Sequence, residues 1–165
     1  MYQLSVFVHV IATVVWIGGM LFLALVAVPA TRRLPPAERG ALFTALGRRF
    51  RTVGWVCIAL LLISGPLNLG FRGYSWESLT SGRLFDGEFG RTLAVKLILV
   101  AIMVGLSLTH ELILGPASAR AMANPDAAHT VAALRRRTSW LARFNLVLGL
   151  LVVASAVALV RGLPW

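Results

Sequence analysis

Polar and sulfur-bearing side chains recur at helical spacing within stretches that are otherwise apolar. Positions three, four or seven apart in a helix share a face. Four faces of this kind are His9, Thr13, Trp16 and Met20; Cys57, Ser64 and Asn68; Lys96, Met103 and His110; and Asn145, Gly149 and Ser155. Imidazole, thiolate and thioether groups suit soft or borderline metal ions such as Cu(I). The pattern therefore leaves metal handling, redox chemistry and permeation as the open classes of function.

Other chemistries lack the residues they need. The single cysteine, Cys57, excludes an intrachain disulfide framework and a multi-cysteine zinc or iron–sulfur site. The sequence has no nucleophile–base pair, no paired carboxylates and no phosphate-binding glycine loop. We therefore predict no catalytic residue; whether the protein is an enzyme stays open, and the pattern favours that it is not.

These residues are positioned by an all-α, polytopic membrane protein. The chain has 165 residues, of which 58% are hydrophobic and only 13% are charged. A membrane-spanning helix needs about 20 apolar residues. Four stretches meet this requirement and predict a four-helix bundle in a single domain, 1–165, with spans at 4–28, 53–71, 93–114 and 140–160. The first is expected to be a retained helix, because residues 1–3 lack the basic start of a signal peptide.

The distribution of the net charge of +10 predicts how the protein is oriented in the membrane. Two of the predicted loops are rich in arginine: Arg32, Arg33, Arg39, Arg48, Arg49 and Arg51 in the first, and Arg120, Arg135, Arg136 and Arg137 in the third. Basic residues near the ends of short loops mark the cytoplasmic side. We therefore predict a multi-pass protein of the inner membrane with both termini on the periplasmic side.

The first of these loops is expected to contain a short interfacial helix. Pro35 and Pro36 could open it, and it would place Leu42, Phe43, Leu46 and Phe50 on one face, opposite Arg39, Arg48 and Arg49. Such a segment lies at the membrane surface with its arginines on lipid headgroups. The lipid bilayer, not nucleic acid, is thus the expected partner of the basic residues.

The depth of the candidate residues in their spans predicts two layers. His9, Asn68 and Lys96 fall in the outer half, whereas Met20, Cys57, His110 and Asn145 fall in the inner half. His9 and His110 would differ in depth by about 18 Å at 1.5 Å per residue, too far to share one metal ion. Structural roles stay open beside these: a hydrogen bond between helices for His9, and snorkelling for Lys96. Trp16, Gly18 and Gly19, with Asn68 and Asn145, are interpreted as packing residues.

A short internal similarity links the ends of the first and third spans. The first ends in Val28-Pro29-Ala30-Thr31-Arg32, and the third in Gly115-Pro116-Ala117-Ser118-Ala119-Arg120. Both run in the same direction across the membrane. A parallel two-helix repeat is one explanation, and in its register His9 coincides with Lys96; chance is the other.

The run from His9 through Trp16-Ile-Gly18-Gly19-Met-Leu-Phe resembles the first helix of the copper resistance protein D (CopD) family. Lys96 opening the third span and Pro29 followed by basic residues fit the same pattern. The resemblance covers the whole chain as a short, four-helix form. It implies a bacterial inner-membrane protein of copper uptake or resistance, often beside a periplasmic copper carrier. The same first helix looks like that of HemJ-type membrane haem proteins, whereas the second helix and the arginine-rich loops depart from that pattern.

Three functions follow as hypotheses. The first is copper binding or transport, with His9 at the periplasmic entry and Met20, Met103, His110 and Cys57 as further ligands. The second is a membrane redox protein that binds haem b through His9, with Lys96 near the propionates. The third is a scaffold or assembly protein that works with another membrane subunit. The ligand, the transport direction and the oligomeric state stay open at this stage.

Overall fold

The computed structural model describes residues 1–122 and 128–161, and these residues are helical apart from short connections. Four of the helices are long and apolar enough to cross a membrane: Tyr2–Ala30, Ala37–Phe71, Gly87–Ala117 and His129–Val160. The predicted all-α membrane fold with four long helices is thus confirmed. Each helix is longer than the span predicted within it, and where the membrane boundaries fall along the helices stays a prediction. The predicted outer position of the C terminus concerns residues 162–165, outside the described part.

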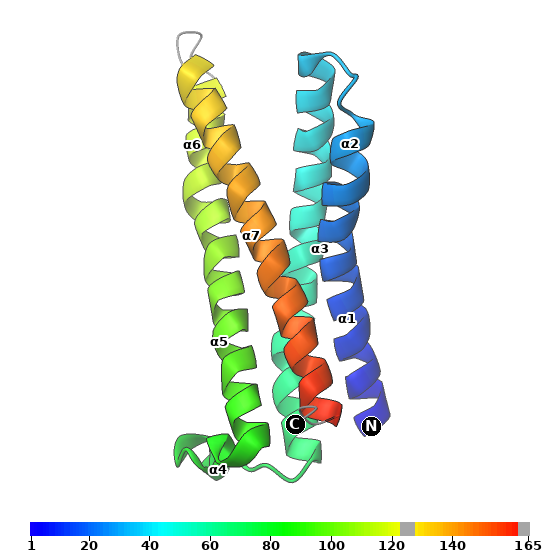
Figure 1. Ribbon diagram of the computed structural model, residues 1–165, viewed down its shortest axis with the longest axis vertical. Helices are drawn as coiled ribbons and strands as arrows, with labels where there is room; N and C mark the ends of the chain where they lie inside the picture. Colours follow the sequence, from blue (N-terminus) through cyan, green and yellow to red (C-terminus); the bar gives the residue numbers. More distant parts are fainter. Residues whose placement is uncertain (123–127, 162–165) are drawn as a thin grey trace. The chain divides into compact units, whose positions relative to one another are not determined.

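The chain divides into two compact units, Met1–Leu84 and Phe85–Trp165. We call them the first and second hairpins, because each consists of two long antiparallel helices packed side by side (Figure 1). The single domain expected over 1–165 stays a prediction.

The first hairpin starts with α1 (Tyr2–Phe22), which continues through the π-helical segment η1 (Leu23–Ala27) into α2 (Val28–Ala30). Pro29 favours the wider π turn, although Pro66 lies inside α3 without one. Pro29 has no N–H to give to the carbonyl of Leu25, and its ring would clash with that carbonyl in a regular α-helix. The wider turn is closed by the N–H of Val28, which bonds to the carbonyl of Leu23 five residues back.

The second helix of this hairpin, α3, runs without interruption over Pro36–Phe71. Pro36 is a favoured first residue because its missing N–H would be unpaired there anyway, and Glu38 in the first turn complements the helix dipole. The predicted start at Pro36 is confirmed. The predicted short interfacial helix, however, is the first part of α3 and not a separate element. Residues 36–52 hold no proline after the first turn and no helix-ending glycine motif, so the helix continues.

At its other end, α3 stops at Arg72, and Gly73 takes a positive φ of 88° that few other residues adopt. The connection to the second hairpin holds α4 (Trp76–Thr80) and a 3₁₀ turn, η2 (Arg83–Phe85). Leu84 is buried there, with 3% of its surface exposed.

The second hairpin repeats the plan of the first. Its first helix is α5 (Gly87–Thr109), continued by the π-helical segment η3 (His110–Leu114) and by α6 (Gly115–Met122). Pro116 again follows the π segment at the second position, and the N–H of Gly115 closes it on the carbonyl of His110. The long helix α7 (Ala128–Arg161) returns beside α5 and α6.

Candidate functional site

The contact face between α1 and α3, which we call the seam, carries a polar pair at its centre. The ring nitrogen Nδ1 of His9 lies 2.8 Å from Oγ of Ser64, a residue with only 3% of its surface exposed. A Cβ placed on Gly65 would lie 3.8 Å from Cε1 of His9, so the glycine leaves room for the ring. Thr13 bonds back to the carbonyl of His9 at 2.8 Å. The imidazole is therefore held in one position between the two helices.

The hydrogen bonds of Ser64 also determine which nitrogen of His9 carries the proton. The Ser64 hydroxyl has one proton, and it donates this proton to the carbonyl of Leu60 at 2.6 Å. Toward His9 it must then accept, so Nδ1 of His9 carries a proton, and in the neutral imidazole the lone pair is then on Nε2. Metal-ligating histidines usually donate their second ring N–H to a partner in this way. The seam thus presents His9 in the tautomer that a metal ligand needs.

The part of the seam nearer the arginine-rich end is closely packed. The indole of Trp16, 7% exposed, lies over Gly54, with Nε1 at 3.5 Å from a Cβ placed there. A Cβ on Gly19 would collide with the ring of Phe50. A Cβ on Gly18, in contrast, meets no atom of the described residues within 4 Å. Of the two glycines, only Gly19 is required by the α1–α3 packing.

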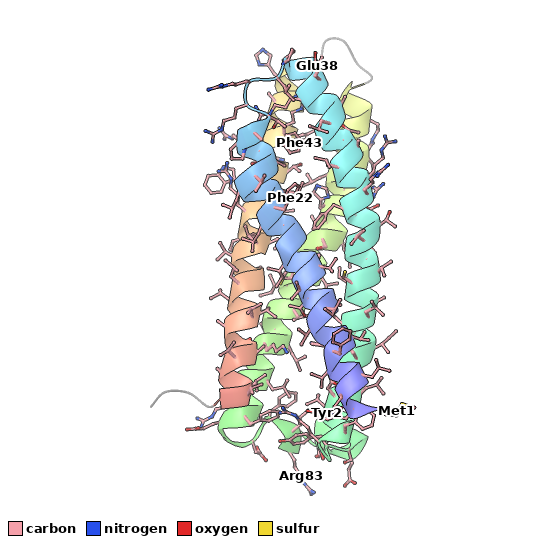
Figure 2. The ribbon with its side chains drawn as sticks, turned by 90° about the vertical axis from the view of Figure 1, so that its right-hand side faces the viewer. Met1, Tyr2, Phe22, Glu38, Phe43 and Arg83 are labelled. Atoms are coloured by element: carbon pink, nitrogen blue, oxygen red, sulfur yellow. The ribbon has the colours of Figure 1, made fainter. Side chains whose placement is uncertain are left out.

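The opposite end of the seam is bounded by an aromatic pair. The rings of Tyr2 and Phe71 lie edge to face with centroids 5.8 Å apart. The guanidinium Nε of Arg72 donates to the hydroxyl of Tyr2 at 3.4 Å. Figure 2 shows Tyr2 at one end of this hairpin and Glu38, at the start of α3, at the other. The seam thus runs from Tyr2 to the arginine-rich end.

Two contacts between α1 and α3 define the register of these helices. Tyr2 lies opposite Phe71, and His9 lies opposite Ser64. The helices are antiparallel, so each step forward along α1 in this part of the seam corresponds to an equal step back along α3. Ser5 and Asn68 lie at the corresponding position between them. Both hold a buried oxygen, Oγ of Ser5 and Oδ1 of Asn68, without a hydrogen-bond partner. Helical spacing predicts that Asn68 shares a face with Ser64. Ser5 was missed, although it lies four residues before His9 and therefore on the same face.

The sulfur ligands predicted for the first hairpin do not gather around His9. Cys57 is buried on α3, seven residues and thus about 10 Å from Ser64 along the helix axis. Met20 is half-buried on α1, eleven residues or about 16 Å from His9. Within the described residues, no three His, Cys, Asp or Glu side chains come together to hold a metal ion. Any metal would therefore meet these donors one after another.

The second hairpin holds the remaining candidates, and their burial differs along the predicted stripe. Met103 is almost fully enclosed, with 1% of its surface exposed, whereas Lys96 is half-buried and His110 is exposed at the start of η3. Between Met103 and His110 the helix is regular α, and a seven-residue spacing drifts by only about 20° around it, so His110 stays close to the face of Met103. Asn145 on α7 is half-buried. A common site of Lys96 or His110 with His9 stays a prediction.

The fold and the seam define a class: a multi-pass α-helical membrane protein with a histidine held between two transmembrane helices. The sequence matches the copper resistance protein D family over residues 44–159, which includes most of α3, α5 and α7. The chain therefore belongs to this family. The match begins in α3, whereas the resemblance in the sequence was strongest in α1.

A protein of Aquifex aeolicus (strain VF5) is similar over almost the whole length. It is 31% identical over 163 residues, which cover 98% of this chain and 97% of the relative. This relative is named "Uncharacterized protein", so the likeness adds no activity. No solved structure matches.

Proposed function

We propose that this protein handles copper in the bacterial inner membrane, binding Cu(I) at His9 and passing it along the seam as part of copper resistance. The observation that carries the proposal is the hydrogen bond from Nδ1 of His9 to Ser64, which directs the lone pair to Nε2. Membership of the copper resistance protein D family supports the choice of metal.

The spacing of donors favours transfer over storage. His9, Cys57 and Met20 follow each other along the first hairpin at intervals of several helical residues. Single donors bind an ion weakly enough to release it, which movement between sites requires. Met103 and His110 would extend this series in the second hairpin. In the predicted orientation His9 is the donor nearest the periplasm, where a soluble copper carrier would deliver the ion.

The test measures Cu(I) binding to the purified protein in detergent, by competition with a chromogenic Cu(I) chelator. His9→Ala should lower the apparent affinity at least about tenfold, as expected for loss of a ligand whose second-shell partners alone contribute 10–100-fold. His129→Ala is the matched control, because it removes an exposed imidazole outside the seam. Equal binding by wild type and His9→Ala would contradict the proposal.

Haem binding is the second candidate, and the same imidazole geometry favours it. An axial histidine ligates iron through one nitrogen and is held by a hydrogen bond from the other. His9 and the small Gly65 beside it fit one such ligand. An absorption spectrum decides: a Soret band that is lost in His9→Ala supports haem, and a colourless protein after expression with added haem excludes it.

A scaffold role remains the third hypothesis, in which the protein assembles with another membrane subunit or a second copy of itself. It predicts that His9→Ala and Cys57→Ala change stability only, with unchanged copper content and spectrum. Purification of the native complex with mild detergent would identify the subunit.

A further inference from the structure

The four polar residues at the Tyr2 end of the seam form a compact square. His9 contacts Ser64, and the register set by this pair and by Tyr2 and Phe71 places Ser5 opposite Asn68. Along each helix the neighbours are four residues apart. Side chains at this spacing have Cβ atoms about 5–6 Å apart, the distance that one bridging water spans. Two corners of the square, His9 and Ser64, bond to each other. The other two do not.

The unpaired corners are the informative ones. Oγ of Ser5 and Oδ1 of Asn68 are both buried and lack a hydrogen-bond partner, and the register of the flanking pairs places the two residues opposite each other. Leaving a buried polar atom unpaired is unfavourable, by about 1–3 kcal/mol, and two of them in adjacent positions require an explanation. A small molecule between them that donates to the amide oxygen and bonds to the hydroxyl would supply it.

The chemistry of the two unpaired oxygens indicates which molecule could bind between them. Two neutral oxygens are too few for a hard cation, which takes about six or more, and neither is a soft ligand for copper. Internal water molecules, in contrast, typically make about three hydrogen bonds to polar groups that the protein leaves unpaired. The square offers such partners on two sides.

We propose that Ser5, His9, Ser64 and Asn68 form a water-binding site within the membrane part of the first hairpin. Water held there connects the imidazole to the aqueous phase on the side of Tyr2 and Arg72, so that a ligand of His9 enters from that end. The inference does not depend on copper or haem, since it concerns the unpaired oxygens alone.

The test is cysteine accessibility in proteoliposomes with no metal added. Cys57→Ser gives a cysteine-free background, since the chain has a single cysteine. Ser5→Cys and Asn68→Cys are introduced separately and treated with a small charged methanethiosulfonate reagent on both faces of the membrane. Only the hydrated thiolate reacts.

Matched controls come from the outward faces of the same helices. Phe7→Cys and Leu67→Cys lie at similar depth on positions that are 61% and 51% exposed to the surroundings of the hairpin. We expect Ser5→Cys and Asn68→Cys to react at least about tenfold faster than these controls, because thiolates form in water and not in lipid. Equal or slower reaction would overturn the proposal.

A stability measurement keeps the inference testable if the cysteine variants do not fold. In a dry seam, Asn68→Leu removes an unpaired oxygen and should raise Tm. In a hydrated seam the same change removes a partner of the water and should lower Tm. A rise in Tm for Asn68→Leu would overturn the proposal.

Discussion

The two hairpins share the same order of helices, including a π segment before a proline, but differ in the side chains at matching positions. A shift of 87 positions (116 minus 29) brings Pro29 onto Pro116 and the π segment Leu23–Ala27 onto His110–Leu114 without a gap. The same shift matches Gly18 with Gly105, and Arg33 with Arg120. Coincident π turns before coincident prolines favour the repeat over chance.

The side chains at the matching positions have diverged. His9 corresponds to Lys96, and the buried Trp16 corresponds to Met103, the most deeply enclosed side chain of the described residues. The first hairpin therefore has an imidazole fixed by a serine, while the second has an ammonium group at the same register. One backbone plan thus carries an imidazole at this position in the first hairpin and an ammonium group in the second.

The largest effect is expected for the buried sulfur of the second hairpin. Met103→Ala should reduce the free energy of unfolding by about 2–5 kcal/mol, because it leaves a cavity at an enclosed position. Met103→Leu keeps the volume and should change it by less than about 1.5 kcal/mol. Denaturant unfolding in detergent measures both. If Met103→Leu keeps stability but loses copper binding, the second hairpin also carries a metal site; an unchanged stability of Met103→Ala would contradict the observed burial.

The second-largest effect is expected for a glycine that only the first hairpin requires. Gly19→Ala should lower the free energy of unfolding by about 1–3 kcal/mol, because the new Cβ collides with Phe50. The matching residue of the second hairpin is already Leu106. Gly18→Ala is the control: its Cβ meets open space, and alanine favours the helix by about 1 kcal/mol. Thermal unfolding of the two variants gives the comparison, and equal Tm values for both would show that the Gly19 contact is not limiting.

Replacing Ser64 should have a smaller effect on stability, but it should change the tautomer of the His9 imidazole. Ser64→Ala removes the acceptor of the His9 proton and should lower the free energy of unfolding by about 1 kcal/mol. ¹⁵N NMR of labelled histidine should show loss of the single Nδ1–H tautomer. Ser155→Ala is the control, since its hydroxyl bonds to the carbonyl of Val152 in its own helix. A mixture of tautomers in the wild type would contradict the assignment.

The prolines should have the smallest effect, and an equal one in both hairpins. Pro29→Ala and Pro116→Ala restore an N–H and remove the residue that favours each π turn, so that η1 and η3 can become regular α-helix. We expect slower amide hydrogen exchange over 23–27 and 110–114, and a change in the free energy of unfolding within about 1 kcal/mol, because these turns adjoin the helix ends. If amide exchange slows in only one of the two hairpins, the two π segments do not depend on their prolines in the same way.

The sequence alone was sufficient for the elements with strong local signals. Hydropathy predicts the four long helices, and Pro36 marks the start of α3. Continuation of α3 through residues 36–52 was missed because the arginines there indicate a membrane surface but do not interrupt a helix. The π segments were missed too, although Pro29 and Pro116 were visible, since a proline can kink, end or widen a helix with the same sequence signal.

The sequence predicts which helix face carries the site residues, but not which residue of the neighbouring helix each of them contacts. Helical spacing placed His9 and Ser64 on inward faces, yet their pairing depends on the register of α1 against α3, which packing sets. Phe50 over Gly19 fixes that register from beyond the predicted span. The deduction about Nδ1 needed the bond from Ser64 to Leu60, which no spacing rule contains.

The uninterrupted course of α3 also has a mechanical consequence. From Gly54, where Trp16 rests on the helix, Ser64 lies about 15 Å away in one direction and Pro36 about 27 Å away in the other. A rigid rod pivoting there by about 5° displaces Ser64 by roughly 1.3 Å and Pro36 by roughly 2.4 Å in opposite directions. The smaller displacement is enough to break a 2.8 Å hydrogen bond to His9. A tilt of the arginine-rich end of α3 about Gly54 would therefore also move Ser64 relative to His9.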